Sequence, residues 1–323
     1  MVKSILAQMA VLVSEYVEAV VMNLYKICCM LVQTVFLAGM LPFKIISSIL
    51  FPNTPKTFSS VFITGAGGGI GAEMARQYAS KDVHLTLADL HTEKLSEVKL
   101  QCEKLGAVVN TISVDVTDKD KMRKAVCAAD DECPLDLVIA NAGVNAPTLL
   151  NKSSKVLSDV SSIVTEVNVI GVCNTLSPAI ERMRSRKSGQ LVITASFFGL
   201  LGMMGDKFTF AYASSKIWAC TYGMGLRTIL QSENVGVTVV CPGAIKTELL
   251  ADVKAKGINL DKTAVDCGPA VKQMIQGVGK NVGVVYVNIG ILTRLVVGVF
   301  GYNLIPPFLW NEAPLVLTAL GSN

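Results

Sequence analysis

Histidine is nearly missing from this chain, because His84 and His91 are the only two in 323 residues. A metal site built on histidines, or a serine–histidine–aspartate triad, is therefore almost excluded on supply alone. The nine cysteines include no CxxC pair and no Cys/His spacing typical of a metal site. We expect them to be reduced thiols in a cytosolic or matrix-like compartment, with no bound metal.

Charge is also scarce. Charged residues make up 17% of the sequence, against about 25% in an average soluble domain. The net charge is +4 without a basic cluster, which argues against nucleic acid as a partner. With 51% hydrophobic residues, this deficit indicates that part of the chain faces a membrane.

The apolar residues concentrate first near the N-terminus. Residues 27–43 carry no charge and just reach the length that a membrane-spanning helix needs. The preceding stretch is apolar but contains Glu15 and Glu18, which favours a helix that lies at the interface or packs in an oligomer. A cleaved signal peptide fits poorly because the region is too long, and a transit peptide fits poorly because arginine is absent before Arg76.

Between the two apolar ends, apolar β-branched runs alternate with helical patterns from Ser59 onward. Such alternation predicts a doubly wound parallel α/β sheet of about seven strands, a Rossmann fold. We therefore divide the chain into a hydrophobic anchor and linker (1–56), the Rossmann domain (57–290) and an apolar tail (291–323) that contacts a membrane or another subunit. Within the domain, one long helix is expected around residues 154–184, and Thr117 is expected to cap the helix that follows it.

The stretch "TGAGGGIG" (64–71) lies between a predicted strand and a predicted helix. Glycine permits a close approach of phosphate to the main chain, and a helix N-terminus offers free N–H groups and a positive dipole end. This context predicts a dinucleotide-binding loop, although a tight turn without a ligand would have the same composition. Asp89 ends the next strand, where a carboxylate bonds the adenosine ribose and repels a 2′-phosphate. No basic residue lies in the loop or directly after Asp89, so we expect NAD rather than NADP.

The stretch "YASSK" places Tyr212 and Lys216 four residues apart, on one face of a predicted helix. A phenol is a poor acid–base catalyst near pH 7, and a neighbouring ammonium together with a cationic nicotinamide ring would lower its pKa. The pair alone is a common coincidence. Its position after a dinucleotide loop and a strand that ends in Ser196 makes it a candidate catalytic centre.

With these motifs in order, the sequence resembles the short-chain dehydrogenase/reductase family over about residues 57–290. The motifs that carry the resemblance are TGxxxGxG at 64–71, "DV" at 115–116, "NAG" at 141–143, Asn168 in "VNVIG", Ser196, "YASSK" at 212–216 and "PGAIKT" at 242–247. The chain departs from the family in having Ala195 before Ser196. A longer interval also separates Ser196 from Tyr212, and it contains the apolar stretch "LLGMMGDKF".

The resemblance implies a role for each matching residue. In the catalytic set, Tyr212 would transfer the proton, Ser196 would bond the substrate oxygen, Lys216 would bind the nicotinamide ribose and tune Tyr212, and Asn168 would hold a water. The resemblance also implies a cofactor-binding set, to which Tyr212 and Lys216 belong together with Gly65, Gly69, Ile70, Gly71, Asp89, Asp115, Val116, Asn141, Gly143 and Thr247.

Membrane-anchored members of the family, the retinol and 17β-hydroxysteroid dehydrogenases among them, are the group to which the chain is similar. The resemblance implies an NAD-dependent enzyme that interconverts a hydroxyl and a carbonyl on a retinoid, steroid or fatty-acyl-derived substrate, as a homodimer or tetramer. We expect it at the endoplasmic reticulum or a lipid droplet with its catalytic domain facing the cytosol, or else at a mitochondrial membrane. The alternative is an accessory subunit of a membrane assembly that retains the fold.

Overall fold

A computed structural model of the chain describes residues 16–17, 20–21, 55–145, 157–197, 210–254 and 262–289. The described residues from 55 to 289 belong to one compact unit. The expected membrane segment 27–43, the tail 291–323 and the apolar stretch 200–208 lie outside the described residues. The domain boundaries at 56 and 290 stay a prediction.

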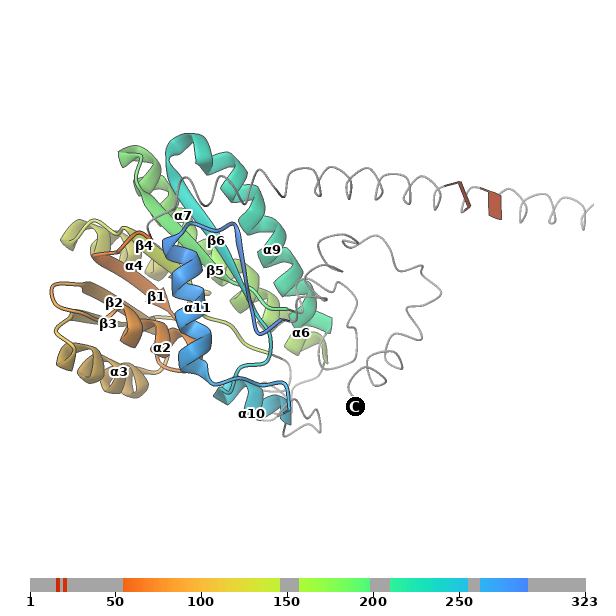
Figure 1. Cartoon of the computed structure of the whole chain (residues 1–323), viewed down its shortest axis with the longest axis horizontal. Coiled ribbons are helices and arrows are strands. Elements are labelled where there is room, and N and C mark those ends of the chain that lie inside the picture. Colours follow the sequence, from red (N-terminus) through yellow and green to blue (C-terminus); the bar gives the residue numbers. More distant parts are fainter. Residues whose placement is uncertain are drawn as a thin grey trace, which may run out of the picture. The chain divides into compact units, whose positions relative to one another are not determined.

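Seven parallel strands form one sheet in the order β3-β2-β1-β4-β5-β6-β7, which confirms the predicted Rossmann-like α/β fold (Figure 1). The strands are β1 (Ser60–Thr64), β2 (His84–Asp89), β3 (Val108–Ser113), β4 (Leu137–Ala140), β5 (Gly189–Thr194), β6 (Val235–Pro242) and β7 (Val284–Val287). The helices are α2 (Gly69–Tyr78), α3 (Thr92–Lys104), α4 (Lys119–Glu132), α6 (Leu157–Thr165), η1 (Glu166–Ile170), α7 (Gly171–Arg186), α9 (Phe210–Leu230), η2 (Gln231–Glu233), α10 (Glu248–Lys254) and α11 (Cys267–Gly279).

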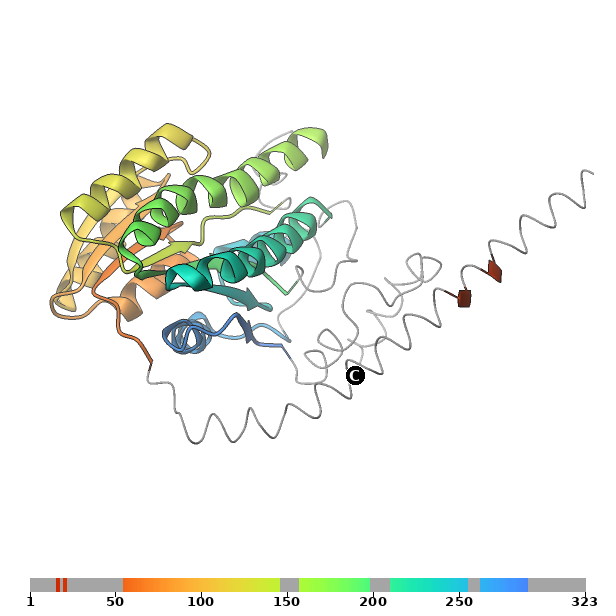
Figure 2. The same ribbon diagram turned by 90° about the horizontal axis from the view of Figure 1, so that it is seen from above.

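Helices cover both faces of the sheet, because successive side chains of a buried strand point to opposite sides (Figure 2). In β1, Ile63 joins the core that α2, α3 and α11 complete. The neighbouring Phe62 joins the core that α4, α7 and α9 complete. All five residues of β1 are buried, as its continuous apolar run predicts.

The strand order reverses between β1 and β4, which pair directly in parallel. Successive crossovers run to one side as far as β3 and to the other side from β4 onward. Such a switch point leaves a crevice outside the carboxyl ends of the two strands, where ligands of open α/β sheets bind. The glycine loop follows β1 and the "NAG" stretch follows β4, so the chain order alone brings both motifs to this crevice.

The expected long helix is present, and its middle part is π-helical. It consists of α6, a π-helical segment η1 and α7, and Asn168 lies within the π-helical segment. π-turns inside α-helices are frequent at functional sites, and no simple sequence pattern announces them. The stretch from Ser158 to Arg186 would also be long and apolar enough to cross a membrane. Half of its apolar window is buried within the domain, as in a core helix.

The N-cap of α4 is Asp118, so the prediction of Thr117 at this position was wrong. The Asp118 carboxylate accepts a hydrogen bond from the Lys121 N–H at 3.0 Å. Thr117 lies one residue before this N-cap, and its hydroxyl donates to Asp115 Oδ1 at 2.8 Å. Aspartate and threonine both suit the position, and the Asx turn made by Asp115 decides between them.

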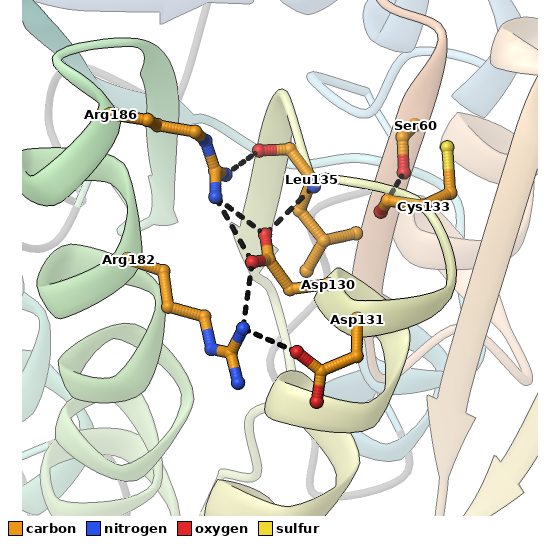
Figure 3. A network of polar contacts seen from close by, with 7 residues as sticks. All are labelled: Ser60, Asp130, Asp131, Cys133, Leu135, Arg182 and Arg186. Atoms are coloured by element: carbon orange, nitrogen blue, oxygen red, sulfur yellow. Dashed lines mark hydrogen bonds and ion pairs between the residues drawn. The ribbon is translucent and has the colours of Figure 1, made fainter.

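A buried carboxylate fastens the connection between α4 and β4 to α7 (Figure 3). Asp130 Oδ1 accepts the Leu135 N–H at 2.9 Å and lies 2.9 Å from Arg186 Nη1. Asp130 Oδ2 lies 3.3 Å from Arg182 Nη1, and Arg186 also donates to the Leu135 carbonyl. The network holds the start of β4 and the end of α7 together, on the side of the domain remote from the crevice.

Candidate active site

The glycine loop has the geometry of a phosphate cradle. Gly65 and Gly69 have φ angles of +65° and +51°, a region that favours glycine. A methyl group on Gly71 would lie 2.1 Å from the Gly65 carbonyl oxygen, so this position admits no side chain. Helix α2 begins at Gly69, and no side chain caps its N-terminus. The loop therefore presents main-chain N–H groups and the positive end of a helix dipole, which fits a pyrophosphate.

Asp89, at the end of β2, is bound to this loop. Its Oδ2 accepts the Gly67 N–H at 2.9 Å, and its Oδ1 accepts the His91 N–H at 3.0 Å. Each carboxylate oxygen keeps one further lone pair for a hydroxyl of a ribose. Gly67 thus contacts Asp89 through its main chain. A methyl group at this position would lie 3.0 Å from the Asp89 carboxyl carbon, so the contact leaves little room for a side chain.

Asn141 joins the ends of β1 and β4 at the switch point. Its Nδ2 donates to the carbonyls of Thr64 and Gly65, at 3.1 and 3.3 Å. The Thr64 hydroxyl accepts the N–H groups of Asn141 and Ala142, at 3.1 and 3.2 Å. These bonds brace the first turn of the glycine loop, which agrees with the expected support of the fourth strand by Asn141.

Asp115 and Val116 follow β3 and lie on different sides of the chain. Asp115 is exposed and bonded to Thr117, whereas Val116 is buried against Gly171, where a methyl group would meet it at 2.6 Å. The Asn174 side chain donates to the Val116 carbonyl at 2.9 Å, so the start of α7 fixes this segment. Sequence reasoning gave no role to Asn174.

Ser196, Tyr212 and Lys216 come together at the carboxyl end of β5. Ser196 follows β5, whereas Tyr212 and Lys216 lie on successive turns of α9. The Lys216 ammonium nitrogen lies 5.5 Å from the centre of the Tyr212 ring and donates to the Thr194 carbonyl at 2.8 Å. A hydrogen bond from Ser196 reaches the Tyr212 phenol and lowers its pKa. The predicted trio is thus assembled by one strand end and one helix face.

Burial dominates the ionisation of both groups on α9. It raises the pKa of Tyr212 above its ordinary value of 10.0, against the smaller opposing effect of Ser196. It lowers the pKa of Lys216 from 10.5 to about 8, because the side chain is only 4% exposed. We expected Lys216 and a cationic nicotinamide ring together to lower the pKa of Tyr212. In the protein alone, desolvation outweighs any such lowering.

Asn168 is fully buried, and its side chain forms hydrogen bonds with the turn that follows β4. Its Oδ1 accepts the Val144 N–H at 2.8 Å, and its Nδ2 donates to the Val144 carbonyl at 2.9 Å. The same Nδ2 donates to the Ser215 hydroxyl at 3.0 Å, and that hydroxyl donates to the Tyr212 carbonyl at 2.7 Å. Asn168 therefore links the "NAG" turn to the Tyr212 main chain. Ser215 was missed from the sequence, although it lies inside "YASSK".

Gly143 and Thr247 each lie next to other candidate residues. A methyl group on Gly143 would meet Asn168 Oδ1 at 3.2 Å and Lys216 Nζ at 3.4 Å, so this turn lies against the centre of the site. A methyl group on Gly69 would meet Thr247 Cγ2 at 3.4 Å, which places Thr247 beside the glycine loop. Ile70, partly buried, packs against the core beneath the loop. These contacts bring Gly69 next to Thr247, and Gly143 next to Asn168 and Lys216, from distant parts of the sequence.

Comparison with known proteins agrees with this arrangement. Residues 59–257 match the short chain dehydrogenase family. An uncharacterized oxidoreductase of Myxococcus xanthus is 33% identical over 196 residues, which cover 60% of this chain and 75% of that protein. The 17-beta-hydroxysteroid dehydrogenase 13 of Rattus norvegicus is 27% identical over 228 residues, which cover 68% and 74% of the two chains.

Solved structures share the fold. A short chain dehydrogenase/reductase from Burkholderia phymatum in complex with NAD superimposes with a TM-score of 0.63 and 22% identity, covering 73% of this chain and 91% of that chain. A protein named ElxO, with NADP bound, has a TM-score of 0.60 and 20% identity, covering 71% and 97%. The fold thus holds either nicotinamide dinucleotide. The family match spans the glycine loop, Asn168, Ser196, Tyr212, Lys216 and Thr247, and the chain is an oxidoreductase of the short-chain dehydrogenase family.

Proposed function

We propose that this chain is a membrane-associated, NAD-dependent oxidoreductase that interconverts a hydroxyl and a carbonyl on a lipophilic substrate. The observation that carries the proposal is the assembly of Ser196, Tyr212 and Lys216 at the carboxyl end of β5, next to the glycine loop. The bound dinucleotide supplies the hydride chemistry. The chain supplies proton transfer, binding and orientation.

Tyr212 is proposed as the acid–base residue. In reduction of a carbonyl, its phenol donates a proton to the substrate oxygen, and in oxidation its phenolate removes the hydroxyl proton. Ser196, which bonds the phenol, also holds the substrate oxygen within reach. Lys216 supplies positive charge beside the ring, and its bond to the Thr194 carbonyl orients it.

Under this proposal, Asn168 positions the part of the chain that carries the acid–base residue Tyr212. Its side chain fixes Val144 and Ser215, and Ser215 fixes the turn of α9 that bears Tyr212. Both the carbonyl and the amide of Asn168 are engaged within the protein. We propose that Asn168 also holds a water, because these contacts leave one lone pair of its side-chain oxygen to accept a hydrogen bond.

NAD is the proposed cofactor because Asp89 ends β2 and is bonded to the glycine loop, and a carboxylate at such a position bonds the ribose hydroxyls and repels a 2′-phosphate. Gly65, Gly69, Ile70 and Gly71 would hold the pyrophosphate. Asp115 and Val116 would border the adenine, Asn141 and Gly143 would support the ribose, and Thr247 would contact the carboxamide.

A lipophilic substrate and a membrane location are proposed from two observations. Residues 27–43 form an uncharged run, and the chain is similar to a 17-beta-hydroxysteroid dehydrogenase. An apolar substrate partitions into a bilayer, so an anchored enzyme meets it at a high local concentration. We propose a retinoid, steroid or fatty-acyl-derived substrate at the endoplasmic reticulum or a lipid droplet, and a homo-oligomer.

The test is a substrate panel with the detergent-solubilised full chain. NADH formation is measured with retinol, hydroxysteroids and long-chain alcohols, and with a short water-soluble alcohol as the matched polar control. Turnover of a lipophilic alcohol that Tyr212→Phe abolishes, while Tyr222→Phe on the same helix retains it, supports the proposal. No turnover of any substrate in either direction, together with stable co-purification in a large complex, would favour the accessory subunit instead.

A further inference from the structure

Thr247 and the first turn of α10 contact three other parts of the domain. The Thr247 methyl group lies next to Gly69 of the glycine loop. Glu248 forms an ion pair with Lys94 of α3, and the Leu249 carbonyl accepts the Asn145 side-chain amide at 3.3 Å. Sequence analysis did not predict α10. The start of α10 is therefore held to α3 by Glu248 and to the turn after β4 by Leu249.

Lys94 lies beside the carboxylate proposed to hold the adenosine ribose. A methyl group on Gly67 would meet the Asp89 carboxyl carbon at 3.0 Å and Lys94 Cβ at 3.1 Å, so the two residues flank the same glycine. The sequence has no basic residue in the loop or directly after Asp89, and Lys94 follows five positions later. The turn between β2 and α3 brings Lys94 back to Asp89, because α3 begins at Thr92.

The charge of Lys94 is already engaged. Its ammonium nitrogen lies 2.5 Å from Glu248 Oε2, across 154 positions of sequence. With Asp89, Lys94 and Glu248 together, this end of the site carries a net charge of −1 (−1 + 1 − 1). Without Glu248 the same three positions would be neutral, and the flexible stem of Lys94 could turn its ammonium to a phosphate near Asp89.

We propose that Glu248 is a cofactor-selectivity residue, which withholds Lys94 from a 2′-phosphate and so favours NAD over NADP. The inference rests on the proposed dinucleotide site and goes beyond it, since Asp89 alone had been given this selectivity. Both side chains are substantially exposed, 45% for Lys94 and 77% for Glu248. The ion pair contributes little to folding in such a place. Its removal therefore leaves the protein folded and testable.

The experiment measures the dissociation constants of NADH and NADPH for the full chain, by the change in nicotinamide fluorescence on binding. The variants are Glu248→Gln, Lys94→Gln, the double variant, and Glu248→Asp as the conservative control. We expect Glu248→Gln to bind NADPH at least about fivefold more tightly and NADH within about twofold of the unmodified chain, since one charge-assisted contact is gained. The double variant should lose the gain, and Glu248→Asp should behave as the unmodified chain.

The gain should also shrink as sodium chloride rises from 0.05 to 0.5 M, because exposed charges are screened at that concentration. An NADPH-to-NADH affinity ratio that is unchanged in Glu248→Gln, while the unmodified chain prefers NADH, would overturn this inference and leave the proposed function intact. A gain that persists in the double variant would also overturn it, because Lys94 would not be its source. Binding of neither dinucleotide by the unmodified chain would overturn the proposed function itself, and this inference with it.

Discussion

The ammonium of Lys216 donates a hydrogen bond to the main-chain carbonyl of Thr194, at 2.8 Å, in the buried layer between α9 and the end of β5. This bond fixes the lysine against the strand that leads to Ser196. It also places a cation where little water reaches it, since the side chain is 4% exposed. Burial lowers the pKa of Lys216, and burial of Tyr212 raises the pKa of its phenol.

The first prediction concerns alkaline stability. Burial lowers the pKa of Lys216 from 10.5 in the unfolded chain to about 8 in the folded one. The unfolded state therefore binds more protons between these values, and this group's contribution to the unfolding free energy rises with pH across that window. The unfolding free energy of the unmodified chain minus that of Lys216→Met should therefore rise by roughly 2 kcal/mol from pH 8 to 9.5.

Urea denaturation of the cofactor-free proteins at several pH values measures this difference. Lys272→Met is the matched control, because Lys272 is an exposed residue of α11. Its difference from the unmodified chain should stay flat over the same range. A flat difference for Lys216→Met as well would mean that Lys216 keeps its ordinary pKa in the folded state.

A second prediction concerns Ser196, whose hydrogen bond lowers the pKa of the Tyr212 phenol. Oxidation of an alcohol needs the phenolate, so removal of the bond should move the pH at half-maximal rate upward. Ser196→Ala should shift this midpoint upward and lower kcat about 10²-fold or more, since general acid–base catalysis typically contributes that much. The pH profile of kcat for oxidation is the measurement.

Ser177→Ala, at an exposed position of α7, is the control for Ser196. It should leave the midpoint and the rate unchanged. A Ser196→Ala profile with the original midpoint would show that the serine bond does not act on the Tyr212 phenol during turnover.

A third prediction compares two glycines of the loop, one in close contact with the main chain and one with open space around it. Gly71→Ala places a methyl group 2.1 Å from the Gly65 carbonyl, and a main-chain contact of this kind cannot be relieved by a rotamer change. We expect a loss of about 2 kcal/mol or more in unfolding free energy, as for severe overpacking. Gly68→Ala meets nothing within 4 Å and should cost less than about 1 kcal/mol, through its N-cap position alone. Thermal and chemical denaturation measure both losses. Equal losses for Gly71→Ala and Gly68→Ala would contradict the assigned geometry.

A fourth prediction concerns the network behind the site. Asp130 is 7% exposed and pairs with both Arg182 and Arg186, and it is the carboxylate that Arg186 contacts, whereas Arg182 also pairs with Asp131. Asp130→Asn should lower the unfolding free energy by about 3 kcal/mol, because breaking a buried pair leaves charge uncompensated. Asp131→Asn is the matched control, since the Asp131 side chain is 65% exposed and should contribute less than about 1 kcal/mol. Similar losses in the two variants would show that Asp130 is not the centre of the network.

Local patterns in the sequence were sufficient for the architecture. Apolar β-branched runs, glycine punctuation and helical stretches predicted seven parallel strands, because a strand buried on both faces must be apolar throughout. The spacing of Tyr212 and Lys216 fixed their shared face, since residues four apart on a helix lie one above the other. The order of the motifs was enough to assign the family that the comparison with known proteins then confirmed.

Other features depend on residues far apart in the chain, and only the tertiary structure decided them. The carbonyl that holds Lys216 belongs to β5, and the π-helical turn buries Asn168 against Val144 and Ser215, which lie on other parts of the chain. The ionisation of Tyr212 followed from burial, which no spacing reveals. Lys94 and Glu248 are separated by 154 positions, and neither belongs to a motif. The sequence by itself determined which elements form, because that is settled by neighbouring residues; the packing of α3 and α10 around the glycine loop determined which charges meet at the cofactor site.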